Sequence, residues 1–206
     1  RELKPLDRLH PIPLFPTDKV TYVGQPVAII VATSKHAAQD AAEALHVEYE
    51  LLDAVLDPDA ALAPDAPRIE PSWPDNLALR VATGKGNPDH IFASAPVVVE
   101  EEIRTHRYVA APMEPRGLAA QVDPASGALT VWSNTQTPHI LKTILANSLD
   151  VSPSLVRVVA VDVGGGFGQK GIQAVEEMLV PFAARALGQP VRWVEERGEN
   201  LVAAAH

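Results

Sequence analysis

Cysteine is absent from the 206-residue chain, and positive charge and long apolar runs are scarce. Without cysteine the chain has no disulfide, no thiolate nucleophile and no cysteine ligand for zinc or an iron–sulfur cluster. No apolar run reaches the roughly 18 residues that a membrane span requires, so we expect no membrane span. The 17 Lys and Arg residues are outnumbered by 26 Asp and Glu residues, giving a net charge of −9. A protein that binds the phosphate backbone needs a basic face, so this balance argues against nucleic acid as a partner.

The remaining composition is typical of a globular protein. Hydrophobic residues make up 47% and charged residues 21% of the chain, which argues against disorder. The length allows one or two small domains, each able to bury a core. Residues 1–5 lead into no apolar segment of the kind that a signal peptide contains, so we expect a soluble, cytoplasmic protein.

The N-terminal part of the chain has the pattern of a β-α-β unit. The continuous apolar run 27–32 predicts a strand buried on both faces. Ser34 is placed to cap a helix over residues 35–46, and the alternation in residues 46–52 predicts a half-exposed strand. A proline-rich connector follows. We therefore predict three parts, residues 1–56, 57–96 and 97–206.

The C-terminal part predicts a second α+β unit, beginning with an extended segment at residues 97–108. Strands at 117–122 and 128–132 flank a turn that ends in Gly127. Pro138 fits the first turn of a helix, and residues 155–161 form a strong candidate for a buried strand. A helix that Pro181 kinks and Gly188 ends is expected after the glycine-rich segment, followed by a strand at 190–194. We expect the apolar face of this helix to carry Ile172, Val175, Leu179, Phe182 and Ala186.

The most informative segment is residues 161–170, in which four of five consecutive residues are Gly164, Gly165, Gly166 and Gly168. Glycine tolerates positive φ and lets a backbone approach a ligand closely. Successive N–H groups between a strand and a helix can form a concave site for an anionic or oxo ligand. A tight structural turn is the alternative, but so many glycines favour a binding loop.

A dinucleotide-binding site is one functional hypothesis for this loop. Gly166, Gly168 and Gly171 satisfy the G-x-G-x-x-G spacing between a predicted strand and helix. Glu195 or Glu196 would then be the acid that binds the ribose of NAD or FAD. Too few residues follow for the remaining strands of a Rossmann-type domain, so a second hypothesis accounts for more of the chain.

Three segments together resemble the molybdenum-binding large subunit of the xanthine dehydrogenase, aldehyde oxidase and carbon monoxide dehydrogenase family. They are Ala111-Pro-Met-Glu-Pro-Arg-Gly117, Trp132-Ser-Asn-Thr-Gln-Thr-Pro-His139 and Val161-Asp-Val-Gly-Gly-Gly-Phe-Gly-Gln-Lys170. Tyr22-Val-Gly-Gln-Pro-Val-Ala28 and the elements after it resemble the α/β hammerhead domain of the same subunit. The resemblance implies an α+β fold, with a hammerhead-like domain followed by the first part of a molybdopterin-binding domain.

The resemblance also implies which residues contact the cofactor, a molybdenum–pterin or its dinucleotide form. Gln136 corresponds to the glutamine whose amide reaches the apical oxo ligand of molybdenum, without ligating the metal itself. Gly164, Gly165, Gly166, Phe167 and Gly168 correspond to the loop beside the metal–pterin unit. Phe167 is also expected to line the substrate funnel. The alternatives are that Gln136 caps the following helix and that Phe167 is a core residue anchoring the loop.

Two departures from the family pattern limit what the chain is expected to do. Gly171 stands where purine-oxidising members have a glutamate, which argues against a purine and leaves an aldehyde, another N-heterocycle or a carbon monoxide-like substrate. The catalytic base, a late glutamate in the family, would lie beyond His206, so we expect no catalytic residue here. We expect a fragment or a naturally split subunit.

The partners implied are the remainder of the molybdenum subunit, an iron–sulfur subunit and an FAD subunit, with these centres on partner chains or missing segments. The intact enzyme would hydroxylate a small-molecule substrate with water-derived oxygen. A scaffold chain without a catalytic role is the remaining alternative.

Other polar candidates are less informative. The seven histidines show no metal-ligand spacing, and His139 alone adjoins a cofactor motif. We expect the acidic runs 100–102 and 195–196 to lie on solvated faces, because neighbours on a strand point in opposite directions. Glu114 is expected either near the site or in an ion pair, with Arg116 or with another domain.

Overall fold

The computed structural model describes residues 15–77, 85–106 and 108–204. Contacts divide the chain into two compact units. One consists of Arg1–Ile12 with Glu48–His106, and the other of Pro13–Val47 with Arg107–His206. Among the described residues, no helix has both the length and the apolar character needed to cross a bilayer.

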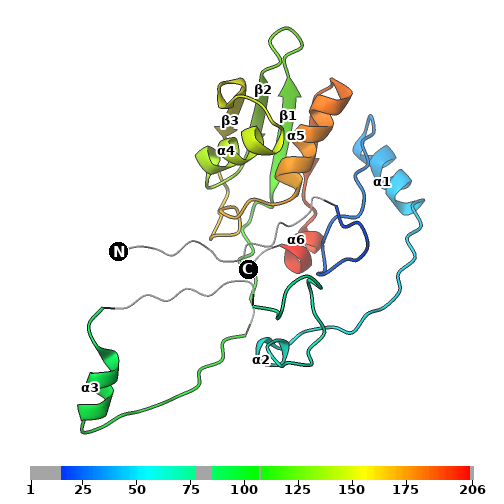
Figure 1. Ribbon diagram of the computed structural model, residues 1–206. Helices are drawn as coiled ribbons and strands as arrows, with labels where there is room; N and C mark the ends of the chain where they lie inside the picture. The colour runs from blue at the N-terminus through cyan, green and yellow to red at the C-terminus, as the bar shows by residue number, and fades with distance from the viewer. Residues whose placement is uncertain (1–14, 78–84, 107, 205–206) are drawn as a thin grey trace. The chain divides into compact units, whose positions relative to one another are not determined.

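A four-stranded mixed sheet organises the second unit. Its strands are β1 (Gly117–Val122), β2 (Leu129–Ser133), β3 (Val156–Ala160) and β4 (Val191–Val194), in the order β3-β2-β1-β4. β1 is antiparallel to β2 and to β4, whereas β2 and β3 are parallel. The strands before and after the glycine loop, β3 and β4, therefore lie at opposite edges of the sheet (Figure 1).

The turn between β1 and β2 forms as its sequence predicts. Asp123 accepts the Gly127 N–H with its carbonyl (2.8 Å) and the Ala125 N–H with its carboxylate (2.9 Å). Gly127 has a φ of +73°, which costs glycine nothing. The turn fixes the register that pairs Val122 with Leu129.

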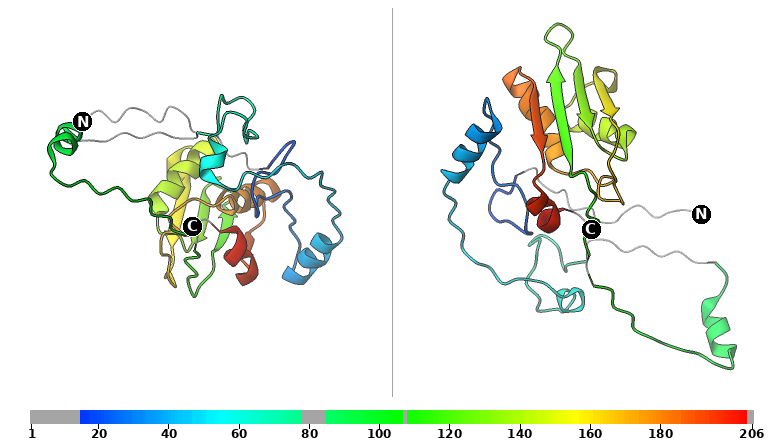
Figure 2. Two further views of the ribbon diagram at one scale, coloured as in Figure 1. Left: turned by 90° about the horizontal axis from the view of Figure 1, so that it is seen from below. Right: turned by 180° about the vertical axis from the view of Figure 1, so that it is seen from behind.

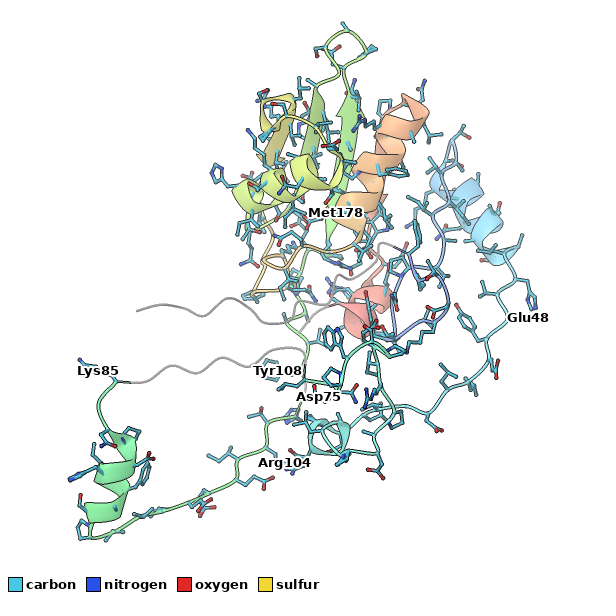
Figure 3. All side chains as sticks on the ribbon, viewed as in Figure 1. Glu48, Asp75, Lys85, Arg104, Tyr108 and Met178 are labelled. Carbon is cyan, nitrogen blue, oxygen red and sulfur yellow. The ribbon has the colours of Figure 1, made fainter. Side chains whose placement is uncertain are left out.

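Two helices cover one face of this sheet and enclose the core. They are α4 (Pro138–Ser148) and α5 (Glu176–Leu187), and Figure 1 shows them in front of the strands. Seen from behind in Figure 2, β1 and β4 lie in front of the helices. Met178, labelled in Figure 3, belongs to the core that α5 makes with the sheet. The buried core side chains are Leu118, Ala120, Leu129, Val131, Leu141, Leu145, Ala146, Val156, Met178, Val180 and Ala184.

The helix after the loop begins later than the sequence predicts. α5 starts at Glu176, because residues 168–171 form turns in which the Gly171 N–H bonds the Gly168 carbonyl (2.9 Å). The expected apolar face is wrong in part, since Ile172 lies outside the helix and Phe182 is exposed. Pro181 is inside the helix and Gly188 ends it at a φ of +62°, as predicted.

The strands predicted for residues 27–32 and 46–52 do not form in this chain, although the helix between them does. That helix is α1 (Lys35–Glu43), capped by Ser34, whose Oγ accepts the Ala37 N–H (3.1 Å). Val27, Ile29 and Val31 are 39% to 43% exposed. A strand needs a neighbour for its N–H and C=O groups. No described segment supplies one here, and the same holds for the extended segment 97–106.

The described residues of Glu48–His106 contain two short helices and no buried residue. α2 (Pro58–Ala61) is capped by Asp57 and α3 (Pro88–Ser94) by Asn87. Arg104, labelled in Figure 3, pairs with Asp59 at 2.9 Å and also with Glu102. The division at residues 56 and 96 remains a prediction. The remaining elements within the described ranges are the 3-10 helix η1 (Pro153–Leu155) and α6 (Arg197–Ala203).

Candidate functional site

The structure brings Gln136 directly onto the glycine loop. Gln136 Oε1 accepts the N–H of Gly168 at 3.1 Å, and the Gln136 N–H donates to the carbonyl of Lys170 at 2.9 Å. The predicted proximity of Gln136 and the loop is therefore confirmed. Gln136 does not cap α4, whose N-cap is Thr137.

The hydrogen bond from Gly168 also orients the Gln136 amide. A backbone N–H can donate only to the amide oxygen, so the NH₂ group must point elsewhere. Nε2 has no hydrogen-bond partner among the residues that the structure describes. Gln136 is exposed. The side chain thus presents a neutral, oriented donor at the surface of the loop.

Three positions of the loop require glycine, because neighbouring side chains lie where a Cβ would be. A Cβ on Gly166 would lie 2.5 Å from Gln136 Oε1, and one on Gly164 would lie 2.6 Å from the Cβ of Glu114. Gly165 has a φ of +92°, and a Cβ there would lie 3.0 Å from Cε2 of Phe167. Larger residues at these positions would push the loop away from Gln136 and Glu114.

Phe167 lies on the surface of the loop rather than in the core. Its φ is +50°, a sparsely populated conformation for a residue with a side chain. The residue is 75% exposed, so the alternative that it anchors the loop from the core is wrong for this chain. Such local strain is typical of binding and catalytic segments.

The loop also leaves backbone donors free. The N–H groups of Gly165, Gly166 and Phe167 have no hydrogen-bond partner within the described part of the chain. Gly166 is nevertheless buried. Because buried N–H groups are rarely left unpaired, the Gly166 N–H is a donor for which the described residues provide no acceptor.

An ion pair holds the two ends of the loop. Lys170 Nζ donates to Glu114 Oε2 (2.7 Å), and the same oxygen accepts the N–H of Gly164 (2.7 Å). The Glu114 N–H in turn donates to the carbonyl of Gly164 (3.2 Å). Glu114 therefore pairs with Lys170 and not with Arg116. The hydrogen bond from Lys170 holds the pKa of Glu114 below its ordinary value, despite the opposing effect of burial.

Arg116 belongs to a second polar network behind the site. Its guanidinium donates to Glu195 at 2.6 and 2.9 Å and to Glu176 at 3.2 Å. Asn200 is fully buried and donates to Glu195 (2.7 Å) and to Gln169 of the loop (3.0 Å). The expectation that Glu195 lies on a solvated face is wrong. It follows the last residue of β4, so the alternation of a strand no longer governs its direction.

This network also removes the support for a dinucleotide site. That hypothesis needs a free acid at residue 195 or 196 beside the loop, whereas Glu195 is bound by Arg116 and Glu196 pairs with Lys35. It also needs adjacent parallel strands on either side of the loop, whereas β3 and β4 lie at opposite edges of the sheet. The G-x-G-x-x-G spacing is therefore present without the free acid and the adjacent parallel strands that a dinucleotide site needs.

Several site residues gave no local sequence signal. Lys170 is 56 positions from Glu114, and Glu177 is 44 positions from Ser133, whose Oγ donates to it at 3.0 Å. Burial raises the pKa of Glu177 above its ordinary value, and its hydrogen bonds offset only part of that effect.

His139 is exposed. Within the described residues, no three His, Cys, Asp or Glu side chains are placed to hold a metal ion.

Comparison with known proteins shows the family to which the chain is similar. Residues 69–206 match the molybdopterin cofactor-binding domain, and residues 5–53 match the a/b hammerhead domain of aldehyde oxidase and xanthine dehydrogenase. The large subunit of nicotine 6-hydroxylase from Paenarthrobacter nicotinovorans is 41% identical over 195 residues, covering 95% of this chain and 24% of the relative. The carbon monoxide dehydrogenase large chain of Hydrogenophaga pseudoflava is 35% identical, covering 99% of this chain and 28% of the relative.

A solved structure is also similar over the whole chain. Quinoline 2-oxidoreductase from Pseudomonas putida 86 superposes with a TM-score of 0.88 at 38% identity, covering 100% of this chain and 26% of that one. The chain therefore belongs to the family of molybdopterin-binding large subunits of xanthine dehydrogenase, aldehyde oxidase and carbon monoxide dehydrogenase. It has the family's order of a hammerhead domain followed by the start of the molybdopterin-binding domain. The chain spans about a quarter of the length of the relatives it matches.

Proposed function

We propose that this chain supplies the first cofactor contacts of a molybdenum hydroxylase, through Gln136 and the loop Gly164–Gly168. The observation that carries the proposal is the hydrogen bond from the Gly168 N–H to Gln136 Oε1 (3.1 Å), which leaves the amide NH₂ as an oriented donor. A neutral donor can bond an oxo ligand without changing the charge of the metal centre.

The donors of the site fit a molybdenum–pterin group. The free N–H groups of Gly165, Gly166 and Phe167 would donate to oxygen atoms of the cofactor, and the absence of a Cβ on the glycines allows its close approach. The cofactor, when bound, supplies the redox chemistry of the hydroxylation. This chain's residues bind and orient, and the iron–sulfur and FAD centres lie on partner chains or on other segments of the subunit.

For the substrate we propose an N-heteroaromatic compound other than a purine. Two similar proteins are named for nicotine and quinoline, which are both N-heteroaromatic. The exposed ring of Phe167 offers a flat surface for such a substrate. Gly171 provides no carboxylate of the kind with which purine-oxidising members hold the heterocycle, although it lies close to Gln136.

The cofactor role is tested by Gln136→Ala in the complete large subunit assembled with its partner chains. We expect turnover per bound molybdenum to fall by about 10- to 100-fold, as for other residues that orient metal-bound groups. Gln121→Ala on the exposed side of β1 is the matched control and should retain full turnover. Normal metal loading with full turnover in Gln136→Ala would favour the scaffold alternative and end the proposal.

The substrate class is tested separately on the unmodified enzyme. We expect kcat/KM for pyridine and quinoline compounds to exceed that for hypoxanthine, benzaldehyde and carbon monoxide by roughly tenfold or more. A preference for an aldehyde or carbon monoxide would refute the substrate proposal while leaving the role of Gln136 unaffected.

A further inference from the structure

One residue pair fixes the loop at both ends. The Lys170 side chain is 1% exposed, and Glu114 Oε2 is its only hydrogen-bond acceptor among the described residues. The same oxygen accepts the Gly164 N–H at 2.7 Å. Glu114 thereby contacts Gly164, the first residue of the loop, and Lys170, which lies in the turn after Gly168. We call the Glu114–Lys170 pair the loop clamp.

The loop clamp is also connected to Gln136. The carbonyl of Lys170 accepts the Gln136 N–H at 2.9 Å and the Oγ1 hydroxyl of Thr135 at 3.2 Å. The Gln136 side chain in turn accepts the Gly168 N–H. A shift of Lys170 would therefore move both the backbone of Gln136 and the loop segment that orients its amide.

Stabilising the fold does not require a charged pair at this place. The Lys170 side chain is 1% exposed, and burying its ammonium carries a desolvation cost that attraction to the 38% exposed Glu114 side chain often only balances. What the charged pair adds is direction, because the carboxylate oxygen must face both Nζ and the Gly164 N–H. Gly164 permits this approach, since a Cβ there would lie 2.6 Å from Glu114 Cβ.

We propose that Glu114 and Lys170 are positioning residues for the hydroxylation, which act by setting the position of the loop and of the Gln136 amide relative to the cofactor. This inference rests on the proposed function. Neither residue needs to touch substrate or cofactor for this role.

The first test uses the complete large subunit, prepared without cofactor. We expect Lys170→Met to increase amide hydrogen exchange at Gly164 and Gln136 by at least about tenfold, because their hydrogen-bond partners lose their fixed positions. Lys85→Met, at an exposed lysine labelled in Figure 3, is the matched control and should change neither amide. Unchanged exchange at both amides in Lys170→Met would refute the clamp.

The second test uses the complete enzyme, with molybdenum content, kcat, KM and the molybdenum EPR spectrum as readouts. Glu114→Gln keeps the size of the side chain and an acceptor for Gly164, and its site is 38% exposed, so folding should tolerate it. We expect Glu114→Gln and Lys170→Met each to lower kcat per molybdenum by about tenfold and to alter the EPR spectrum, with little change in KM. The double variant should be no worse than the more affected single variant, since the residues act as one unit.

The outcomes separate this inference from the proposed function. Loss of activity in proportion to loss of molybdenum, with an unchanged EPR spectrum and unchanged kcat per molybdenum, would reduce the clamp to a structural role and overturn the inference. If Lys170→Met fails to fold, Glu114→Gln alone decides. A defect in Gln136→Ala without one in the clamp variants would refute only the clamp, whereas a fully active Gln136→Ala would refute the proposed function itself.

Discussion

Residues 15–106 and residues 108–204 contain similar apolar segments that end in different environments. The run 27–32 and the segment 155–161 both predict buried strands. The first remains exposed, whereas the second becomes β3, in which Val156 is 2% exposed. The difference is that β2 supplies β3 with a parallel neighbour, pairing Leu129 with Val156. An apolar pattern therefore predicts which residues tend to be buried, but not which segment packs against them.

The largest expected difference between these regions is the loss of stability when an arginine is removed from an ion pair. Arg116 is 13% exposed and pairs with the fully buried Glu195. Arg116→Met would leave that carboxylate buried and unpaired, so we expect the free energy of unfolding to fall by about 3–5 kcal/mol. Arg104→Met is the matched control, since solvent screens its pair with Asp59.

Urea denaturation followed by tryptophan fluorescence measures both changes, because Trp193 lies beside Arg116, 5.5 Å from its guanidinium carbon. Arg104→Met should leave the transition where it is. Equal shifts in the two variants would contradict the distinction between a buried and a solvent-screened network.

Two leucines, one from each region, allow the same comparison for apolar side chains. Leu141 of α4 is fully buried between the helix and the sheet. We expect Leu141→Ala to lower the free energy of unfolding by about 2–5 kcal/mol, through lost transfer energy and the cavity left behind. Leu51 is 93% exposed, and Leu51→Ala should change the value by less than about 0.5 kcal/mol. A loss of similar size at Leu51 would show that residues 48–106 bury a core after all.

How far the sequence could predict this structure depends on whether the signal was local. The turn at Asp123–Gly127, the start of α4 at Pro138 and the end of α5 at Gly188 follow from local backbone preferences, and all were predictable. The meeting of Gln136 with the loop followed from resemblance to a family. The loop clamp was not predictable, because a pair of charges 56 positions apart has no periodic signal.

The error at Glu195 and the late start of α5 have physical causes as well. Glu195 was expected to be solvated because a strand alternates, but β4 ends one residue earlier. α5 begins only at Glu176 because the turns after Gly168 take up the intervening residues. Boundaries of this kind depend on tertiary contacts, which override local preference.

Two buried carboxylates predict opposite dependences of stability on pH. Burial raises the pKa of Glu195, but the hydrogen bonds from Arg116 outweigh it, so the pKa lies below its ordinary value of 4.5. Its contribution is present above pH 4.5 and is lost as the pH falls through the lowered value. The pKa of Glu177 is raised above 4.5, so its protonated form favours the folded state and stability falls as the pH rises through that value.

Free energies of unfolding measured between about pH 3 and pH 8 separate the two groups. Glu195→Gln should remove part of the loss below pH 4.5 and leave the rest of the profile. Glu177→Gln should remove part of the decline above pH 4.5. If the two variants change the same part of the profile, the assignment of these carboxylates is wrong.

The smallest expected effect concerns the first turn of a helix. α1 has nine residues and none of them is buried, so its Ser34 cap is a major part of what holds it. We expect Ser34→Ala to cost this helix about 1 kcal/mol, which corresponds to roughly fivefold faster amide exchange at its interior. α4 has no side-chain cap, but Leu141 and Leu145 bury its apolar face, so amide exchange in its interior does not depend on a cap. Unchanged exchange in α1 after Ser34→Ala would mean that tertiary contacts hold residues 35–43 too, and that the two regions differ less than their burial indicates.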